Sequence, residues 1–340
     1  AILAQAQAIL AQDIRAPSLW RRALLCRLRL LGTMELMAAA DPNSGAAVGT
    51  ESRAQLSWKN GLSLVAYIAN FAVTYGSLTG VFGATNTDLS LKYQTLVTPA
   101  GWAFSIWGPI FISEGVFAVA QMLPRFRGSL VVAALAPWWW GVCTAQAAWT
   151  LAFAQEVIPL SLVFMLVILV CLFGIALSTD GLTMPAAEYW LLRAPFSLHL
   201  GWIVAASVVN ANVQADYSMA SPGELLGLAV LSYALVAAIA TVFTVAFRSP
   251  DPIACLVVSW AFAGVRAELG DARSLNDPKR FNPHVWDQVT LEGLRFAALY
   301  VSLGALGLAC GGAVLRFLAA RRSASENKRL INVCGRTLGA

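Results

Sequence analysis

Apolar runs of about 20 residues recur between residues 61 and 318 of this 340-residue chain. A helix of that length matches the roughly 30 Å hydrocarbon core of a bilayer. Hydrophobic residues make up 58% of the chain and charged residues only 12%, whereas a soluble domain is about one quarter charged. Lipid cannot satisfy backbone polar groups, so a spanning segment must satisfy its own. The pattern therefore predicts an all-α integral membrane protein that crosses the bilayer several times.

The runs predict eight helices, at residues 61–82, 100–122, 129–153, 157–178, 190–213, 224–247, 252–268 and 294–318. We expect residues 58–213 to form a five-helix core and residues 214–318 to add about three helices, with a loop at 270–293. Residues 319–340 are expected to form a basic C-terminal tail. The seventh run is the weakest, because it is short and ends in Arg266 and Glu268. Two glycine pairs, Gly76 with Gly80 and Gly307 with Gly311, predict close helix approach.

Lysine and arginine are distributed unevenly among the connecting segments. With eight spans, the N-terminus, the even-numbered loops and the C-terminus share one side, and Lys92 is the only basic residue in the first, third and fifth loops. Cytoplasmic loops carry an excess of basic residues, which predicts that both termini face the cytosol, stroma or matrix. This placement accounts for the net charge of +5 better than nucleic-acid binding does. The basic side holds Arg53, Lys59, Arg125, Arg127, Arg248, Arg316, Arg321, Arg322, Lys328 and Arg329.

The first 57 residues do not follow the membrane pattern and are expected to form a leader or flexible segment. Residues 1–33 hold five arginines and one acid, Asp13, a composition that resembles an organelle transit peptide. The alternative is that Met34 is the initiator and the preceding residues are an upstream artefact. The first interpretation favours an organellar membrane, of a plastid or a mitochondrion. The six cysteines are scattered without metal-like spacing, and indicate neither a disulfide framework nor a structural metal.

Three of the predicted helices carry polar groups in line with aromatic side chains. Polar groups are costly in hydrocarbon unless they face a bundle interior or a cavity. The second, third and fifth helices are therefore expected to line a common aromatic pocket, which suits a large planar ligand with a few polar edges. The stripes are Phe104, Trp107, Phe111 and Glu114 on the second helix, Gln146, Trp149 and Phe153 on the third, and His199, Trp202 and Asn210 on the fifth.

Two residues of these stripes have competing interpretations. His199 could be the axial ligand of the metal in a bound haem or chlorophyll, and Glu114 could serve in the same way. Alternatively, His199 bonds to a neighbouring helix, and Glu114 is protonated and hydrogen-bonded between helices. The protein itself is not expected to hold a metal ion.

The motifs around these residues resemble the tryptophan-rich sensory protein family, also called translocator protein or TspO/MBR-related, in its longer branch. Residues 93–111, YQTLVTPAGWAFSIWGPIF, are similar to the family's second-helix signature. Residues 192–213, LRAPFSLHLGWIVAASVVNANV, are similar to its fifth helix, and residues 146–156, QAAWTLAFAQE, to a third-helix element. The resemblance covers about residues 60–213, and the last three helices fit the longer branch less specifically.

Membership would imply a five-helix bundle whose pocket opens toward the loop after the first helix. It would also imply binding of tetrapyrroles such as porphyrin or haem, and of sterols or other lipids. The family's pocket tryptophans map onto Trp102, Trp107 and Trp149, and its fifth-helix asparagine onto Asn210. The chain departs from the family pattern at Pro99-Ala100-Gly101 and at His199, and has no sterol-recognition motif at the end of the fifth helix.

These observations favour a non-enzymatic membrane protein that binds a tetrapyrrole, carotenoid or lipid in an aromatic pocket. The alternative is an accessory structural subunit of a larger photosynthetic complex in a plastid, binding chlorophyll or carotenoid. Membrane lipids are expected partners, and a homo-oligomer or a complex is expected. Enzymatic activity is less favoured, because no nucleophile–base constellation, paired carboxylates or nucleotide-binding motif is found. No inverted repeat indicates a secondary transporter.

Overall fold

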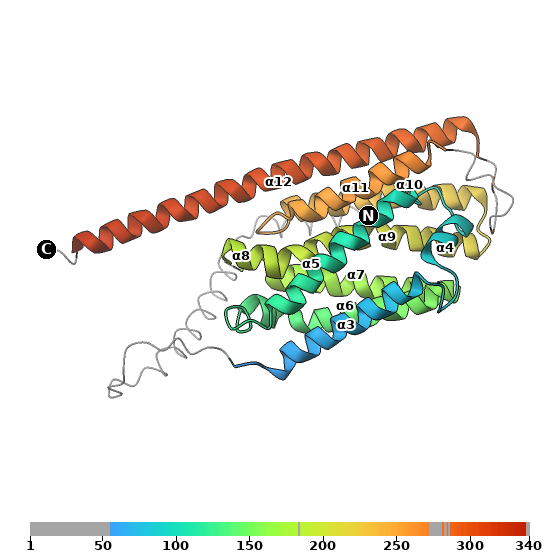
Figure 1. Ribbon diagram of the computed structural model, residues 1–340. Coiled ribbons are helices and arrows are strands. Elements are labelled where there is room, and N and C mark those ends of the chain that lie inside the picture. The colour runs from blue at the N-terminus through green and yellow to red at the C-terminus, as the bar shows by residue number, and fades with distance from the viewer. Residues whose placement is uncertain (1–54, 183, 272–280, 282–283, 285, 338–340) are drawn as a thin grey trace, which may run out of the picture. The chain divides into compact units, whose positions relative to one another are not determined.

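The computed structural model of the protein describes residues 55–182, 184–271, 281, 284 and 286–337. Nearly all of the predicted leader, residues 1–57, lies outside these ranges, as does much of the predicted loop at residues 270–293. The described residues are helical or lie in turns and connecting segments, as the sequence predicts for a multi-pass membrane protein (Figure 1).

Helices occupy all eight predicted positions. The second begins with a 3₁₀ segment, η1, and the fifth begins with a short helix, α8, and a π-helical turn, η2. A further short helix, α4, follows the first. The bounds are α3 Trp58–Ser77, α4 Asn86–Lys92, η1 Gly101–Ile106, α5 Trp107–Ala120, α6 Leu130–Ala154, α7 Ile158–Thr179, α8 Ala186–Glu188, η2 Tyr189–Arg193, α9 Ala194–Tyr217, α10 Pro222–Val245, α11 Pro252–Glu268 and α12 Gln288–Thr337.

Six of these segments are long and apolar enough to cross a membrane. They are η1 with α5, α6, α7, α8 through α9, α10, and the first part of α12. Helix α11 falls short because it has only 17 residues, which span about 25 Å at 1.5 Å per residue. Helix α3 has 20 residues but is less apolar than the others. The prediction of a multi-pass membrane bundle is thus confirmed. The weakness of α11 agrees with the sequence, whereas α3 is weaker than predicted.

The lower apolarity of α3 follows from which of its faces is buried. Its buried residues are all polar, whereas Leu62, Val65 and Ile68 on the opposite face are exposed. Lipid accepts an apolar outer face. Among the inner polar groups, Asn60 pairs with Gln121 and Ser63 accepts from Trp140 of α6. Helix α3 ends five residues earlier than predicted, because Gly80 and Gly83 adopt positive φ angles of 76° and 134° in the following turn.

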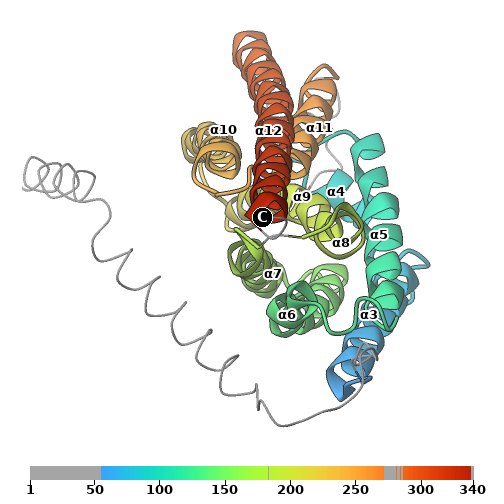
Figure 2. The same ribbon diagram turned by 90° about the vertical axis from the view of Figure 1, so that its left-hand side faces the viewer.

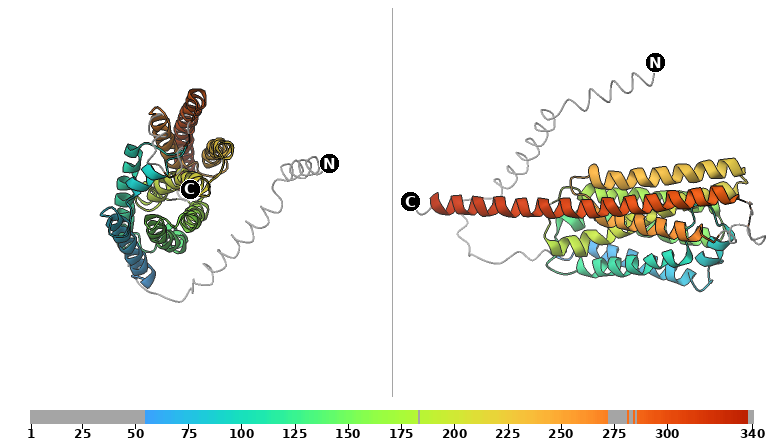
Figure 3. Two further views of the ribbon diagram at one scale, coloured as in Figure 1. Left: turned by 90° about the vertical axis from the view of Figure 1, so that its right-hand side faces the viewer. Right: turned by 90° about the horizontal axis from the view of Figure 1, so that it is seen from above.

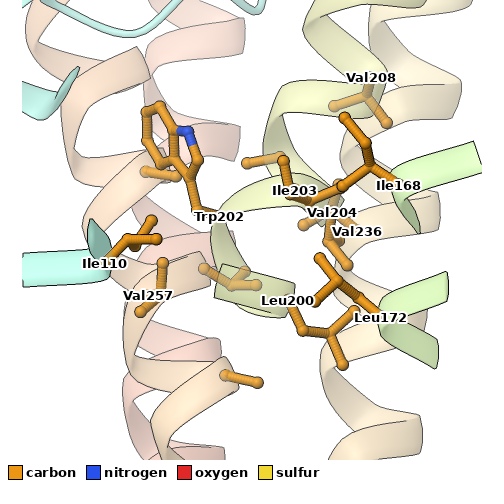
Figure 4. Packing of buried hydrophobic residues seen from close by; sticks show 14 of the residues in the cluster. Ile110, Ile168, Leu172, Leu200, Trp202, Ile203, Val204, Val208, Val236 and Val257 are labelled. Atoms are coloured by element: carbon orange, nitrogen blue, oxygen red, sulfur yellow. The ribbon is translucent and has the colours of Figure 1, made fainter. Parts of the chain in front are cut away.

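Helix α9 lies at the centre of the bundle. Seventeen of its 24 residues are buried, and in the end-on views it lies among the other helices (Figure 2; Figure 3, left). Figure 4 shows its side chains against four neighbours: Ile110 of α5, Leu172 of α7, Val236 of α10 and Val257 of α11. The residues carried by α9 are therefore shielded from lipid on most sides.

Close approach between α9 and α11 depends on Gly201. A Cβ atom at this position would lie 2.5 Å from the carbonyl oxygen of Ala254 and 2.8 Å from Cβ of Val257. The glycine pairs singled out in the sequence do not mediate packing, so that prediction is wrong. Gly80 lies outside α3, and nothing lies within 4 Å of a Cβ built at Gly307 or Gly311.

Helix α12 is much longer than predicted. It has 50 residues and includes residues 319–337, which were predicted to form a basic tail. Its C-terminal part extends past the ends of its neighbouring helices (Figure 1; Figure 3, right). The last alanine of α12 among the buried core residues is Ala309. The side chains of Val314, Leu315, Phe317 and Leu318 are exposed.

Candidate functional site

Two adjoining chambers lie at the end of the bundle where α3 ends. The wide chamber has a volume of about 500 Å³ and lies between α3, α4, the η1–α5 segment and α6. The narrow chamber has a volume of about 60 Å³ and lies between the η1–α5 segment, α9 and α11. Ligand pockets usually measure about 300–1,000 Å³, so the wide chamber is the one large enough for a ligand of that class.

Three aromatic side chains predicted from the stripes line both chambers. They are Phe104, Trp107 and Trp149. The Trp107 ring lies 6.2 Å from that of Trp202 and 5.7 Å from that of Phe111, measured between centroids. Because Phe111 lines the wide chamber and Trp202 the narrow one, Trp107 stands at the boundary between them.

Of the other predicted residues, Phe153 of the third helix and Trp202 and Asn210 of the fifth line the narrow chamber. Phe153 stacks on Trp149 with centroids 5.2 Å apart, and Trp202 meets Phe104 edge-on at 5.5 Å. Asn210 Nδ2 donates to Ser161 Oγ of α7 at 3.2 Å. The asparagine is thus already partnered within the bundle.

Three buried polar side chains of the chambers have no hydrogen-bond partner among the described residues. Both amide atoms of Gln146, the indole Nε1 of Trp149 and that of Trp202 lack one. Gln146 is fully buried and lines the wide chamber, and Trp149 lines both chambers. Buried polar groups nearly always have partners. These groups can therefore hydrogen-bond to a guest molecule that enters the chambers.

The structure pairs Glu114 with His199 instead of placing them on the chamber walls. His199 Nδ1 lies 2.7 Å from Glu114 Oε1, and both side chains are buried. Neither residue lines either chamber. The His199 ring meets Trp107 edge-on, with centroids 5.7 Å apart. Of the two interpretations weighed for these residues, the geometry supports a bond between helices.

Trp102 lies apart from the other predicted site residues. It is 47% exposed and lines neither chamber. Its ring packs edge-on against Trp260 of α11 at 4.8 Å. The resemblance assigned Trp102 to the pocket, but its contact with α11 instead places it on the outer face of η1.

Several lining residues were not identified from the sequence. Asn86 and Ser90 of α4 line both chambers, and Phe262 of α11 lines the narrow one. Helix α4 has a sequence signal that could have located it, because Thr85 and Asp88 form a reciprocal capping box. Helix α11 also begins with a signal, the cap Asp251 followed by Pro252, but one sequence does not show that it packs beside η1. There the amide of Ala100 donates to the carbonyl of Gly264 at 3.0 Å, and Trp260 Nε1 donates to the carbonyl of Ala103 at 2.9 Å.

A polar cluster ties α4 to the α6–α7 turn beside the chambers. Lys92 donates to Glu156, and the Tyr93 hydroxyl donates to the same Oε2 atom at 2.7 Å. These hydrogen bonds hold the pKa of Glu156 below its usual range, Lys92 having the larger effect. Burial, and then the bond to Glu156, raise the pKa of Tyr93. Since Tyr93 lines the narrow chamber, the cluster fixes part of its wall.

A family model described as TSPO-like protein matches residues 60–276. The chain belongs to the TSPO-like family. This confirms the resemblance drawn from the second-, third- and fifth-helix motifs. The match extends beyond residue 213 and includes α10 and α11 of the TSPO-like chain. Helix α11 is also the one that contributes Phe262 and Val265 to the narrow chamber. No curated protein and no solved structure matches the chain.

Proposed function

We propose that the protein is a non-enzymatic membrane protein that binds a planar, mostly apolar ligand, a tetrapyrrole or a lipid, in the wide chamber. One observation carries the proposal: an aromatic chamber of about 500 Å³ is bordered by the unpartnered amide of Gln146 and the unpartnered indole N–H of Trp149. Flat aromatic walls favour a planar guest. The buried donors and the acceptor fit the polar edge of such a guest.

The family relation supports a tetrapyrrole, because porphyrins are ligands known for TSPO-like proteins in general. The residues present fit such a group. Phe104, Trp107 and Trp149 would contact its faces, and Gln146 would hydrogen-bond to its edge. We do not assign an axial ligand, because His199 and Glu114 are engaged with each other. A bound tetrapyrrole would supply light absorption and, if metallated, redox chemistry.

Titration of the purified protein in detergent with protoporphyrin IX, followed by the Soret absorbance, tests the proposal. Trp149→Phe keeps a flat ring and removes the N–H, and Gln146→Leu removes the amide at similar volume. Each should weaken binding about fivefold, the value of one hydrogen bond of about 1 kcal/mol. Trp102→Phe is the matched control, because Trp102 lines neither chamber, and it should leave the affinity unchanged.

Equal effects of all three substitutions would overturn the proposal, since they would indicate binding to the outer apolar surface. A competition arm separates the two ligand classes. A neutral lipid that displaces the porphyrin from the wild type and loses affinity in Gln146→Leu would assign the chamber to lipid. Failure of a lipid to compete would favour the tetrapyrrole.

The finer points of localisation are also proposals. The basic loops support termini on the cytosolic, stromal or matrix side, and the arginine-rich leader supports an organellar membrane. A protease-protection assay on a C-terminal epitope in sealed organelles tests the orientation: cleavage from outside would contradict a stromal or matrix location. Membership of a photosynthetic complex stays a prediction from sequence alone, and co-migration with a pigmented complex on a native gel would test it.

A further inference from the structure

A second cavity, separate from the chambers, lies where α3 and α6 begin. It has a volume of about 210 Å³ and is bordered by the start of α3, the α5–α6 connection and the first turns of α6. The wide chamber lies toward the other end of the same two helices. We call this cavity the basic groove, because Lys59 and Arg127 are the charged residues among its lining.

Positive potential converges on the basic groove from two kinds of source. The first is the pair of side-chain cations. Arg127 is half-buried, and its Nε atom is buried without a partner among the described residues. The second is the start of two helices, which are capped by Ser57 and Ser129. Helix N-termini favour anions. One carboxylate lies beside the groove, Glu188, which accepts from Ser129 Oγ at 2.6 Å.

The floor of the groove is rigid. Asn60 and Gln121 form a closed pair: Asn60 Nδ2 donates to Gln121 Oε1 at 2.8 Å, and Gln121 Nε2 donates to the Asn60 carbonyl at 2.9 Å. Trp140 Nε1 donates to Ser63 Oγ at 3.0 Å. These bonds fix α3 against α5 and α6 without using the two cations. The groove is therefore preformed, and its charges stay available to a guest.

The remaining wall of the groove is apolar. Val132, Ala133 and Ala136 of α6 form it. Beside it, Trp58 and Trp140 lie with ring centroids 5.9 Å apart, and Trp58 is 69% exposed. Tryptophan is enriched at the membrane–water interface. The groove thus joins two cations to an apolar wall. This combination fits a ligand with an anionic headgroup and an apolar chain better than it fits a small soluble ion.

We propose that the basic groove binds the phosphate of an anionic membrane lipid. Arg127 and Lys59 hold the phosphate near the starts of α3 and α6, and an acyl chain lies along Val132 and Ala136. Basic pockets between spanning helices bind anionic headgroups by the same combination of charge and apolar contact. The groove does not depend on the ligand of the chambers, so this proposal stands apart from the proposed function.

Binding of a short-chain phosphatidylglycerol to the full-length protein in neutral detergent tests the proposal. Isothermal titration calorimetry should show that Arg127→Gln and Lys59→Gln each weaken binding about fivefold, the effect expected for one cation near an anionic headgroup. Arg125→Gln is the matched control. Arg125 is exposed, lies against Phe126 and is not part of the groove, so its replacement should change the affinity less than twofold.

Two comparison ligands identify what the groove recognises. Short-chain phosphatidylcholine, which has the same phosphate but no net charge, should bind at least fivefold more weakly than phosphatidylglycerol. Inorganic phosphate at equal concentration should not displace the lipid. Displacement by phosphate would overturn the lipid assignment in favour of a soluble anion. An equal loss in the Arg125 and Arg127 variants would overturn the site itself, because it would indicate diffuse surface charge.

Loss of folding is distinguished from loss of binding by a further variant. Arg127→Lys keeps the positive charge and should retain most of the affinity, whereas Arg127→Gln should not. The thermal unfolding midpoint of each variant is measured alongside. If Arg127→Lys binds as weakly as Arg127→Gln while both unfold like the wild type, charge does not carry the interaction and the proposal fails.

Discussion

Glu114 of α5 and His199 of α9 form a fully buried hydrogen bond, with 2.7 Å between Oε1 and Nδ1, and the His199 ring meets Trp107 edge-on. The second oxygen of Glu114 and the Nε2 of His199 have no partner among the described residues. Each side chain therefore depends on the other. Ionisable residues within membrane helices occur mainly where they pair or face a cavity, and this pair joins the helix that carries Trp107 to the central helix.

Removing both partners should destabilise the bundle by less than the sum of the two single losses. Glu114→Leu leaves the buried imidazole unpaired and should cost about 1–3 kcal/mol, and His199→Phe should cost a similar amount. In the double variant no polar group is left unpaired, so its loss should be smaller than the sum of the two. Thermal unfolding in detergent, read as a double-mutant cycle, measures this coupling. Additive losses would show that the two side chains act independently.

The same variants address the axial-ligand interpretation of His199. Because neither residue lines a chamber, His199→Phe should leave the Soret spectrum of added haem unchanged. Glu114→Gln is the conservative control, since an amide can still hydrogen-bond to the imidazole. A shifted Soret band in His199→Phe, with a normal band in Glu114→Gln, would instead identify the histidine as a metal ligand.

Gly201 should be intolerant of even one methyl group. Its Cβ would lie 2.5 Å from the carbonyl oxygen of Ala254, so Gly201→Ala must separate α9 from α11. Overpacking of this kind costs about 1–3 kcal/mol. Gly227 of α10 is the matched control, because nothing lies within 4 Å of a Cβ there. Gly227→Ala should be neutral or stabilising, by up to about 1 kcal/mol. Thermal unfolding midpoints of both variants test this prediction. Equal midpoints would contradict the close contact between Gly201 and Ala254.

The sequence was most informative about helix positions, because hydrophobicity over about 20 residues sets them. It was less informative about helix ends and about weakly apolar helices. Helix α3 was located, yet its inward face is polar, with Asn60 and Asn70 buried. A helix with polar residues inside and apolar residues outside is expected where lipid, not water, surrounds the bundle. The switch from 3₁₀ to α geometry at Trp107 and the π turn before α9 have no simple periodic signature.

The candidate site was predicted in part. Helical spacing placed Phe104 and Trp107 in one stripe and Trp149 in another, because residues three and four apart share a face. All three side chains line the chambers. It could not show that Glu114 and His199 contact each other, since their 85-residue separation leaves the relative height of the two helices undetermined. It located α11 but did not show that this helix forms part of the chamber wall, beside the contact of Ala100 with Gly264. To predict a contact between two helices, one must know how far each is shifted along and rotated about its axis. A single sequence does not give this.

The buried cluster at the start of α9 should make the fold sensitive to loss of its carboxylate. Arg193 Nη2 donates to Asp251 Oδ2 at 3.0 Å, and Ser197 Oγ donates to the same oxygen at 2.7 Å. Asp251→Ala leaves the Arg193 guanidinium buried without its carboxylate, which should cost about 3–5 kcal/mol. Ser197→Ala removes a hydroxyl that donates to Asp251 and accepts from Arg193 Nη1, but leaves the ion pair, and should cost less, about 1.5–3 kcal/mol. Thermal unfolding ranks the two, and an equal or reversed order would show that the ion pair is dispensable.

The Lys92–Glu156 contact should give the bundle an acid-sensitive component of stability. Lys92, and then Tyr93, lower the pKa of Glu156, so over the acid range the folded state binds fewer protons than the unfolded state. The contribution is therefore present above the unfolded pKa of about 4.3 and is lost as the pH falls through the lower folded pKa. Glu156→Gln should flatten the fall of the unfolding midpoint between about pH 5 and about pH 3.

The side chains of both partners are more than one third exposed, so the effect should be modest and should weaken in high salt. Lys92→Met is the reciprocal variant. It leaves the Tyr93 hydrogen bond in place, so the fall of the midpoint should be only partly flattened. Unfolding midpoints of the wild type, Lys92→Met and Glu156→Gln, measured at the same pH values in low and high salt, test whether the acid sensitivity decreases in that order. If the wild type and Glu156→Gln lose stability in parallel on acidification, the carboxylate of Glu156 is not the group responsible.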